Sequence, residues 1–235
     1  RKGNIYKGKV SRIEPSLGAA FVNYGAERHG FLPFKEISPQ FYPEKQNRNS
    51  RLTVSDCLKK DQEILVQVEK DERGNKGAAL TTNISLAGRY LVLMPNNPKA
   101  AGISRRLEGK ERDKLKERIA LLNVPESMGL IVRTAGEGKD LEDLKWDLEY
   151  LQRVWEGISE ANTLKNSPIL IFKESDIIIR ALRDYLKEDI EEIWVDTEEA
   201  FEEASEFVER VMPDQSKILN KYENTLPLFT RYQIE

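Results

Sequence analysis

Ile5-Tyr-Lys-Gly-Lys-Val10 begins an alternating pattern of apolar and polar residues that resumes at Ala19-Ala-Phe-Val22, after Pro15-Ser-Leu-Gly18. A period of two residues is typical of a β-strand, and Pro and Gly between two such runs indicate a tight turn. The stretch therefore predicts two antiparallel strands that form a hairpin.

Three more short strands are expected after the hairpin. They are Gly30-Phe-Leu32, Glu63-Ile-Leu-Val-Gln-Val68 and Ala78-Ala-Leu-Thr81, with Arg73-Gly-Asn-Lys76 as the tight turn between the last two. The polar segment from Pro39 to Ser50 predicts a long exposed loop. Five short strands in about 80 residues favour a closed β-barrel of the OB type, assigned to residues 1–82.

Residues 83–178 mix strand and helix patterns. Strands are expected at Tyr90-Leu-Val-Leu-Met94, Gly129-Leu-Ile-Val-Arg-Thr134 and Pro168-Ile-Leu-Ile-Phe172, the last as a buried strand. A charged helix is expected from about Lys110 to Leu122, and an amphipathic helix from about Leu141 to Ala161. The apolar face of the second helix holds Leu144, Leu148, Leu151 and Trp155. The segment predicts an α/β domain beside the barrel.

Residues 179–235 contain little sheet. A short helix is expected near Ala181 to Leu186, an apolar strand at Ile193-Trp-Val195 and an acidic helix from Glu198 to Val211. One strand and two helices are expected either to be completed by residues outside this chain or to pack on the second segment. The whole chain is therefore expected to have an α+β multidomain fold.

The composition indicates a soluble protein. Hydrophobic residues make up 39% and charged residues 33%, and no apolar run approaches the roughly 20 residues that cross a bilayer. No signal peptide is expected, and a start at Arg1 in place of Met suggests a processed or excised piece. The single cysteine, Cys57, cannot form an internal disulfide, which favours a reducing, cytoplasmic setting.

Charge divides the chain into two parts. Residues 1–112 carry 21 Lys and Arg against 12 Asp and Glu, whereas residues 113–235 carry 16 against 28. A net charge of +9 on the first part favours a polyanion partner, with a solvated basic surface as the alternative.

Aromatic and basic residues coincide on the predicted barrel. Phe21, Tyr24 and Phe31 fall on adjacent strands, accompanied by Lys7, Lys9, Arg28, His29 and Lys76. Bases stack on aromatic rings while cations pair with phosphates, so the set predicts a grip on single-stranded RNA. For each ring alone, packing in the barrel core is an equally good interpretation.

A second candidate site follows an apolar strand, at Arg133-Thr-Ala-Gly136. A guanidinium, a hydroxyl and a glycine-containing backbone can together bind a phosphate, although such a short motif also occurs by chance. Two more guanidinium groups lie in Gly102-Ile-Ser-Arg-Arg106.

Metal chemistry finds little support in these residues. His29 is the only histidine, and it is most simply a polar surface residue beside the RNA face. Asp196 is a single carboxylate after a strand, which cannot hold a catalytic magnesium pair.

Several long motifs closely resemble the ribonuclease E/G family, its ribonuclease E branch more than its ribonuclease G branch. They include Ala19 to Pro33, Glu72 to Thr82, Tyr90 to Pro98, Gly102 to Arg106, Gly129 to Gly136 and Leu228 to Glu235. The resemblance covers essentially the whole chain.

The resemblance implies a magnesium-dependent endoribonuclease that cuts single-stranded, AU-rich RNA with a 5′-monophosphate, in RNA processing and mRNA decay. On the family plan, residues 1–82 match an S1-type OB barrel, 83–178 a 5′-sensor domain and 179–235 part of an RNase H-like subdomain. The positions that grip RNA match Phe21, Phe31 and Lys76, with Tyr24 and Lys7 nearby. The positions that hold the 5′-phosphate match Arg133 and Thr134, supported by Gly88, Val92 and Arg105.

Other family features have no match in this sequence. The aspartates that bind Mg²⁺, and the cysteine pair that links subunits through Zn²⁺, are expected C-terminal to Glu235, so no catalytic or metal-binding residue is assigned and the chain alone is expected not to cleave RNA. The full-length family member is expected to be a cytoplasmic homotetramer, peripheral at the inner membrane, and a scaffold for RNA-decay proteins. The alternative is a stand-alone, non-catalytic RNA-binding regulator.

Overall fold

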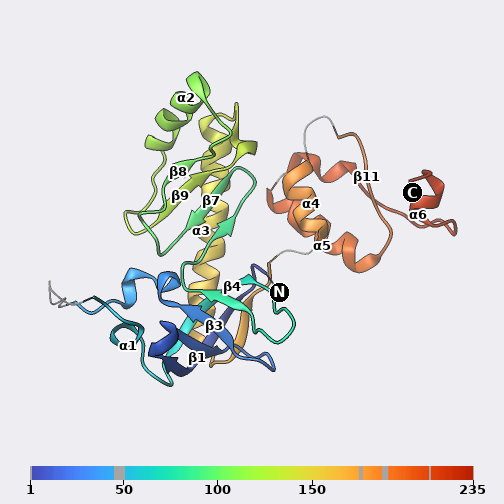
Figure 1. Cartoon of the computed structure of the whole chain (residues 1–235). Coiled ribbons are helices and arrows are strands. Elements are labelled where there is room, and N and C mark those ends of the chain that lie inside the picture. The colour runs from blue at the N-terminus through green and yellow to red at the C-terminus, as the bar shows by residue number, and fades with distance from the viewer. Residues whose placement is uncertain (1, 45–50, 175–176, 187–189, 212, 235) are drawn as a thin grey trace. The chain divides into compact units, whose positions relative to one another are not determined.

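The computed structural model describes residues 2–44, 51–174, 177–186, 190–211 and 213–234. The chain divides into two compact units, Arg1–Glu174 and Ser175–Glu235 (Figure 1). Among the helices of the described residues, none combines the length and the apolar character needed to span a membrane.

The first unit begins with a closed five-stranded barrel. Its strands are β1 (Ile5–Glu14), β2 (Ala19–Asn23), β3 (Gly30–Pro33), β4 (Glu63–Lys70) and β5 (Ala79–Thr81), in the order β1-β2-β3-β5-β4 with β4 returning to β1. The β3–β5 pairing is parallel and the others are antiparallel. A short helix, α1 (Val54–Cys57), precedes β4. The predicted OB-type barrel is confirmed.

Both predicted tight turns are present. Pro15–Leu17 forms a single 3-10 turn that ends at Gly18. Arg73 and Lys76 exchange backbone hydrogen bonds of 3.1 and 3.0 Å, and Gly74 between them has a φ of 55°, which glycine adopts without strain. Of the predicted loop, residues 45–50 lie outside the described part of the chain.

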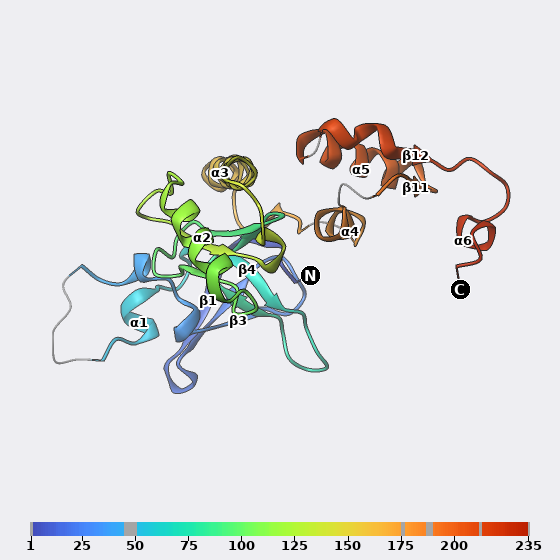
Figure 2. The same ribbon diagram turned by 90° about the horizontal axis from the view of Figure 1, so that it is seen from above.

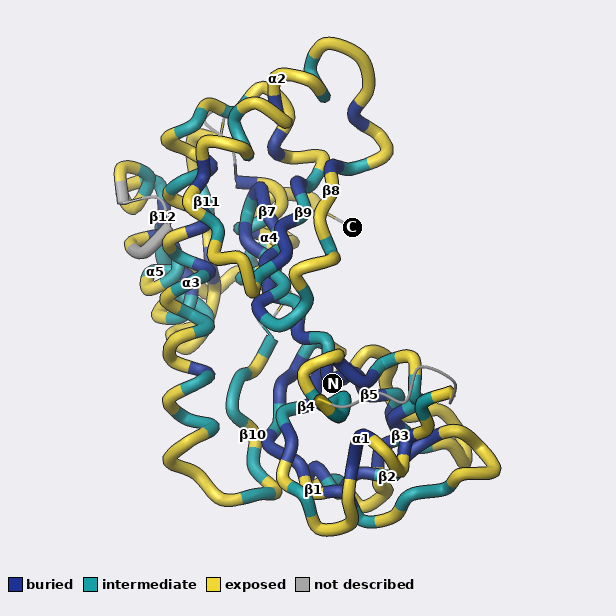
Figure 3. Tube along the Cα trace, turned by 90° about the vertical axis from the view of Figure 1, so that its left-hand side faces the viewer, coloured by how far each residue is buried: buried dark blue, intermediate teal, exposed yellow. Residues whose placement is uncertain are grey.

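The barrel core follows the alternation of its strands. Ala20 and Val22 of β2 and Leu32 of β3 are fully buried, whereas Phe21 and Phe31 are only half-buried and lie outside the core cluster. Figure 3 shows the buried stretches of these strands. Because neighbouring residues in a strand point to opposite faces, the two phenylalanines face outward.

The rest of the first unit is a four-stranded sheet with two helices. The strands are β6 (Leu86–Ala87), β7 (Leu91–Met94), β9 (Gly129–Val132) and β8 (Gly102–Ile103), in that spatial order. The helices are α2 (Gly109–Ala120) and α3 (Leu141–Leu164), and α3 is seen end-on in Figure 2.

Helix α3 packs through its apolar face as predicted. Asp140 caps its first turn by accepting a hydrogen bond from the Asp143 N–H at 2.9 Å. Leu144, Leu148 and Leu151 are buried in one cluster with the leucines of β7, and Trp155 is partly buried against it.

The position of strand β10 (Ile169–Phe172) was not predicted from the sequence. It pairs antiparallel with residues 5–7 of β1 and so belongs to the barrel sheet. The strand itself was predicted correctly, but its buried character was wrong, because none of its residues is fully buried. Its backbone instead occupies the part of the β1 edge that β2 leaves uncovered.

The C-terminal end of α3 is bound by a lysine of the barrel. The Lys7 ammonium donates to the carbonyls of Asn162 and Lys165 at 2.9 and 2.8 Å, and lies 3.1 Å from a carboxylate oxygen of Glu63. Glu63 in turn accepts hydrogen bonds from the Ser167 N–H and hydroxyl. A cation suits the negative end of the helix dipole. We call Lys7, Glu63, Ser167 and the two carbonyls the α3 joint.

The second unit has more sheet than the sequence indicated. Strands β11 (Ile193–Val195) and β12 (Leu219–Lys221) are parallel, and α5 (Glu198–Val211) connects them ahead of a 3-10 segment at Pro213–Ile218. Helix α4 (Ile177–Tyr185) packs on α5, and the unit buries a core of its own. The short helix α6 is Leu228–Arg231. The prediction of a single strand was wrong, because β12 was missed.

The α3 joint predicts how stability depends on pH. The hydrogen bonds from Ser167, with those from Lys7, lower the pKa of Glu63 from 4.5 to about 2. The joint therefore stabilises the fold fully above pH 4.5 and loses this contribution as the pH falls towards 2. We expect Glu63→Gln to flatten the fall in melting temperature between these pH values, measured by circular dichroism. Glu69→Gln, an exposed residue of the same strand, is the control, and equal acid sensitivity of Glu63→Gln and wild type would contradict the assignment.

Candidate nucleic-acid interface

Two outward-facing aromatic rings lie side by side on the barrel. Phe21 of β2 is directly opposite Phe31 of β3, and their ring centroids are 5.8 Å apart in an edge-to-face arrangement. The Arg12 guanidinium lies 4.7 Å from the Phe21 centroid. Half-buried rings beside cations form a surface on which bases can stack.

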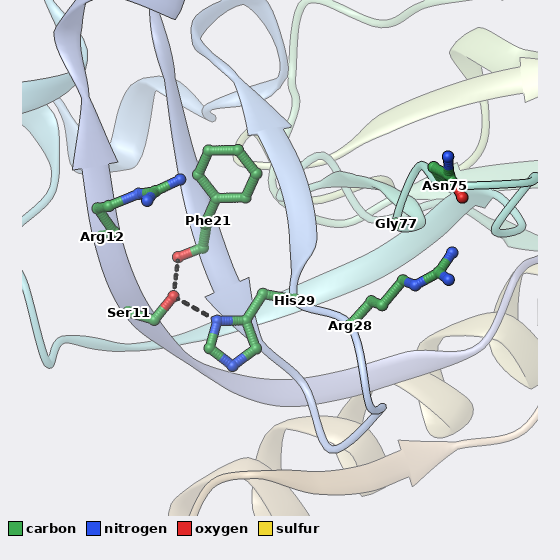
Figure 4. A pocket seen from close by; sticks show the side chains of 7 residues that line it. All are labelled: Ser11, Arg12, Phe21, Arg28, His29, Asn75 and Gly77. Atoms are coloured by element: carbon green, nitrogen blue, oxygen red, sulfur yellow. Dashed lines mark hydrogen bonds between the residues drawn. The ribbon is translucent and has the colours of Figure 1, made fainter.

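Basic groups surround this pair. A hollow of about 490 Å³ beside Phe21 is lined by Arg12, Arg28 and His29, among others (Figure 4). Lys76 is exposed in the turn that leads to β5, the parallel neighbour of β3. The structure therefore places Arg12, Arg28 and His29 around the hollow beside Phe21, and Lys76 lies between Asn75 and Gly77, which also line it.

Tyr24 does not share this outward face. It is 6% exposed, packs edge-to-face on Tyr6 and donates a hydrogen bond to Glu72 at 3.2 Å. Burial and that hydrogen bond raise the pKa of Tyr24 to about 12. The expected grouping with Phe21 was wrong because Tyr24 has the inward register of Ala20 and Val22.

Lys7 is also turned away from the rings. Its ammonium is held by the α3 joint and the residue is only 9% exposed. The expected place beside the RNA face is wrong, since Lys7 faces α3.

At the second candidate site, three loops meet at one edge of the four-stranded sheet. Strands β8 and β9 are parallel, so the loops that follow them leave the same edge, and the β6–β7 turn returns there. The Ser104 and Thr134 hydroxyl oxygens are 3.0 Å apart, and the Ser104 N–H donates to the Val132 carbonyl. Arg105 is exposed in the β8 loop.

Arg133 is oriented by the β6–β7 turn. Its guanidinium donates to the carbonyls of Gly88 and Arg89 at 2.6 and 3.4 Å. Thr134 is exposed beside it, at the start of a 3-10 turn. Val92 lies on β7 opposite Ile131, half-buried within the sheet. The structure thus gathers Gly88, Arg133, Thr134 and the loop of Arg105, with Val92 on the adjoining strand.

A buried carboxylate supports this arrangement. Asp147 of α3 is 4% exposed and accepts hydrogen bonds from the N–H groups of Arg89, Tyr90 and Leu91 at 2.8 to 3.0 Å. A Cβ at Gly88 would lie 2.5 Å from its oxygens, so only glycine allows this approach. Burial raises the pKa of Asp147, while the three N–H donors and Arg133 act in the opposite direction.

Sequence reasoning missed Asp147, although a signal was present. An acidic residue three positions after Leu144 and four before Leu151 interrupts an apolar helical face. Such a residue needs a buried partner.

No candidate metal centre is found among the residues that the structure describes. Within those ranges, no group of three or more His, Cys, Asp or Glu side chains is arranged to hold a metal ion. Asp196 is exposed after β11.

Asp147→Asn is expected to lower the free energy of unfolding by about 2 kcal/mol or more, because an amide nitrogen would then face buried N–H donors. Urea unfolding of the whole chain, followed by tryptophan fluorescence, measures this. Glu149→Gln, exposed on the same helix, should change it by less than about 0.5 kcal/mol. Equal midpoints for Asp147→Asn and wild type would disprove the supporting role.

Comparison with known proteins agrees with the family resemblance. Residues 1–83 match the S1 RNA binding domain, and residues 85–235 match the Ribonuclease E/G family. The whole chain is 56% identical to ribonuclease E of Haemophilus influenzae and 55% identical to ribonuclease E of Escherichia coli. It is 36% identical, over 99% of its length, to ribonuclease G of Escherichia coli.

The chain spans only part of these relatives: 25% and 22% of the two ribonuclease E proteins and 48% of ribonuclease G. The family match nevertheless covers more than half of the chain. The chain belongs to the ribonuclease E/G family and includes an S1 RNA-binding domain.

Proposed function

We propose that this chain is the RNA-binding and 5′-monophosphate-sensing part of a ribonuclease E-like, single-strand-specific endoribonuclease that acts in RNA processing and mRNA decay. The observation that carries the proposal is the outward-facing pair of Phe21 and Phe31 on a barrel that matches an S1 RNA binding domain.

On the barrel, bases of single-stranded RNA stack against Phe21 and Phe31, while the Lys76 ammonium pairs with the phosphates of the RNA. Stacking on an aromatic ring contributes about 1 to 3 kcal/mol per base without requiring a particular sequence. Tyr24 and Lys7 do not contact the RNA directly. Tyr24 is buried in the barrel core, and Lys7 is bound in the α3 joint.

At the sheet edge, Arg133 and Thr134 bind the 5′-monophosphate. A guanidinium suits phosphate because its planar fork pairs with two oxygens, and a neighbouring hydroxyl adds a donor. Gly88 and Asp147 keep Arg133 in position, and Val92 of β7 and Arg105 of the β8 loop support the site from the adjoining strand and loop.

Hydrolysis is not assigned to any described residue of this chain. Magnesium-dependent cleavage and zinc-linked assembly would need ligands other than these, because the described residues offer no suitable cluster. We therefore expect the chain alone to bind RNA without cutting it. Incubation with a fluorogenic single-stranded RNA and Mg²⁺ measures this, and turnover abolished by a substitution within the chain would refute it.

The two sites are separable by one experiment. Fluorescence anisotropy compares single-stranded RNAs that differ only in a 5′-monophosphate or a 5′-hydroxyl. Phe31→Ala should weaken binding of both RNAs by about tenfold, the loss of one stacked base. Arg133→Ala should remove the preference for the monophosphate and leave hydroxyl-ended RNA bound as in wild type.

The controls are Leu17→Ala, exposed on the barrel, and Arg153→Ala, exposed on α3. Both should resemble wild type. An undiminished end preference in Arg133→Ala would exclude the sensor assignment, and unchanged affinity in Phe31→Ala would exclude the stacking face.

A further inference from the structure

Helix α2 contacts both loops of the candidate phosphate site, although the proposed function gives it no role. Figure 1 shows the helix beside β8 and β9. The β8 loop, residues 104–108, follows β8, and the β9 loop, residues 133–140, follows β9. Helix α2 is rich in charged residues, and three of its charged side chains bind these loops: Glu111, Arg112 and Arg118.

Arg112 holds the β8 loop. Its guanidinium nitrogen Nη1 donates to the carbonyl oxygens of Ile103, Ser104 and Leu107, at 3.3, 3.2 and 3.4 Å. These three carbonyls lie on either side of Arg105 in the sequence. The backbone conformation that presents Arg105 is therefore fixed by a side chain of α2.

Glu111 and Arg118 hold the far end of the β9 loop. A Glu111 carboxylate oxygen accepts a hydrogen bond from the Gly138 N–H at 3.0 Å, and the Arg118 guanidinium donates to the Lys139 carbonyl at 2.5 Å. The Glu111 and Arg118 side chains are 3.8 Å apart, with exposed fractions of 25% and 28%. Because both are largely shielded from water, their contacts to the loop are stronger than those of a fully exposed pair.

Backbone hydrogen bonds run through the β9 loop from these contacts to the phosphate-binding residues. The N–H groups of Gly136, Glu137 and Lys139 donate to the carbonyls of Arg133, Thr134 and Gly136, at 3.0 to 3.2 Å. Each of these bonds closes a turn of four residues and so restricts the backbone dihedral angles within it. Fixing the far end of the loop therefore also restricts where the Thr134 hydroxyl lies.

The two loops meet at the phosphate-binding groups. The Ser104 hydroxyl of the β8 loop and the Thr134 hydroxyl of the β9 loop are 3.0 Å apart. A ligand that is contacted from two loops is bound well only if its binding groups are held within about 0.5 Å of the productive geometry. Since one helix binds both loops, α2 can set the distance between them.

We propose that Glu111, Arg112 and Arg118 are positioning residues of the 5′-phosphate site, which hold the β8 and β9 loops at the separation that the phosphate requires. This inference rests on the function proposed for Arg133 and Thr134. The three side chains act through loop backbone and not on the RNA. Their loss should therefore reduce the preference for a 5′-monophosphate and leave binding of bases to the barrel unchanged.

Two substitutions at Glu111 test the proposal. Anisotropy on the whole chain gives the end preference, defined as the Kd of a 5′-hydroxyl single-stranded RNA divided by that of its 5′-monophosphate counterpart. Glu111→Ala removes the acceptor of the Gly138 N–H and should reduce the end preference by at least about threefold, the effect of one typical hydrogen bond. Glu111→Gln keeps an oxygen that accepts from the same N–H, so it should retain most of the preference.

A third substitution addresses the β8 loop. Arg112→Met keeps an unbranched side chain without its donors and should also reduce the end preference by at least about threefold. Glu117→Ala and Lys116→Met, exposed on the same helix, are the matched controls and should keep the wild-type preference. Circular dichroism melting shows which variants are folded, and the Glu111 pair decides if Arg112→Met is not.

The outcomes separate this inference from the proposed function. An unchanged end preference in Glu111→Ala or in folded Arg112→Met would overturn the positioning role, as would equal losses in Glu111→Ala and Glu111→Gln. In each of these cases the sensor assignment stands if Arg133→Ala abolishes the preference. A full preference in Arg133→Ala, or none in wild type, would instead remove the proposed 5′-phosphate site and this inference with it.

Discussion

The two edges of β1 constrain the whole first unit. Along one edge, residues 5–9 bond to β4 and close the barrel. Along the other, residues 9–14 bond to β2, and β10 occupies residues 5–7, where β2 no longer pairs. Residues 5–7 of β1 are therefore paired on both edges and leave no backbone for a further strand. Only residues 165–168 join α3 to β10. The pairing of β10 with β1 therefore also limits where α3 can end.

Buried or partly buried charges then hold α3 at two points. Near its C-terminal end Lys7 binds two helix carbonyls, and nearer its N-terminal end Asp147 binds three N–H groups of the β6–β7 turn. Removing the side chain of Lys7 or Asp147 would leave buried polar groups without a hydrogen-bond partner. Such a loss lowers the stability of the fold by more than a surface ion pair contributes. These two contacts connect the barrel to the loops that position Arg133.

Local patterns in the sequence were sufficient for the five barrel strands and for much of the candidate site on the barrel. Alternation identifies β1 to β5, and it also places Phe21 outward and Tyr24 inward, since Tyr24 has the register of Ala20 and Val22. The expected grouping of Tyr24 with Phe21 was based on residue type and did not take the strand register into account. In contrast, the two helix carbonyls that Lys7 binds lie 155 and 158 residues away in the sequence, so no local pattern distinguishes it from an RNA-binding lysine. Strand β12 is three residues long and exists through its pairing with β11.

Helix α3 also has a consequence for binding at two sites. Asp147 and Asn162 are 15 positions apart in the 24-residue helix, which corresponds to about 22 Å along the axis. A continuous helix between the barrel and the loops that position Arg133 fixes their separation better than a flexible linker would. Under the proposed function, a strand held on Phe21 and Phe31 presents its 5′ end to Arg133 only if the intervening nucleotides span the fixed distance. The gain in affinity from binding at both sites is greatest when the length of the intervening RNA matches the distance between the sites. The gain is lost when the 5′ end cannot reach Arg133. End recognition would therefore depend on the length of unpaired RNA as well as on the phosphate itself.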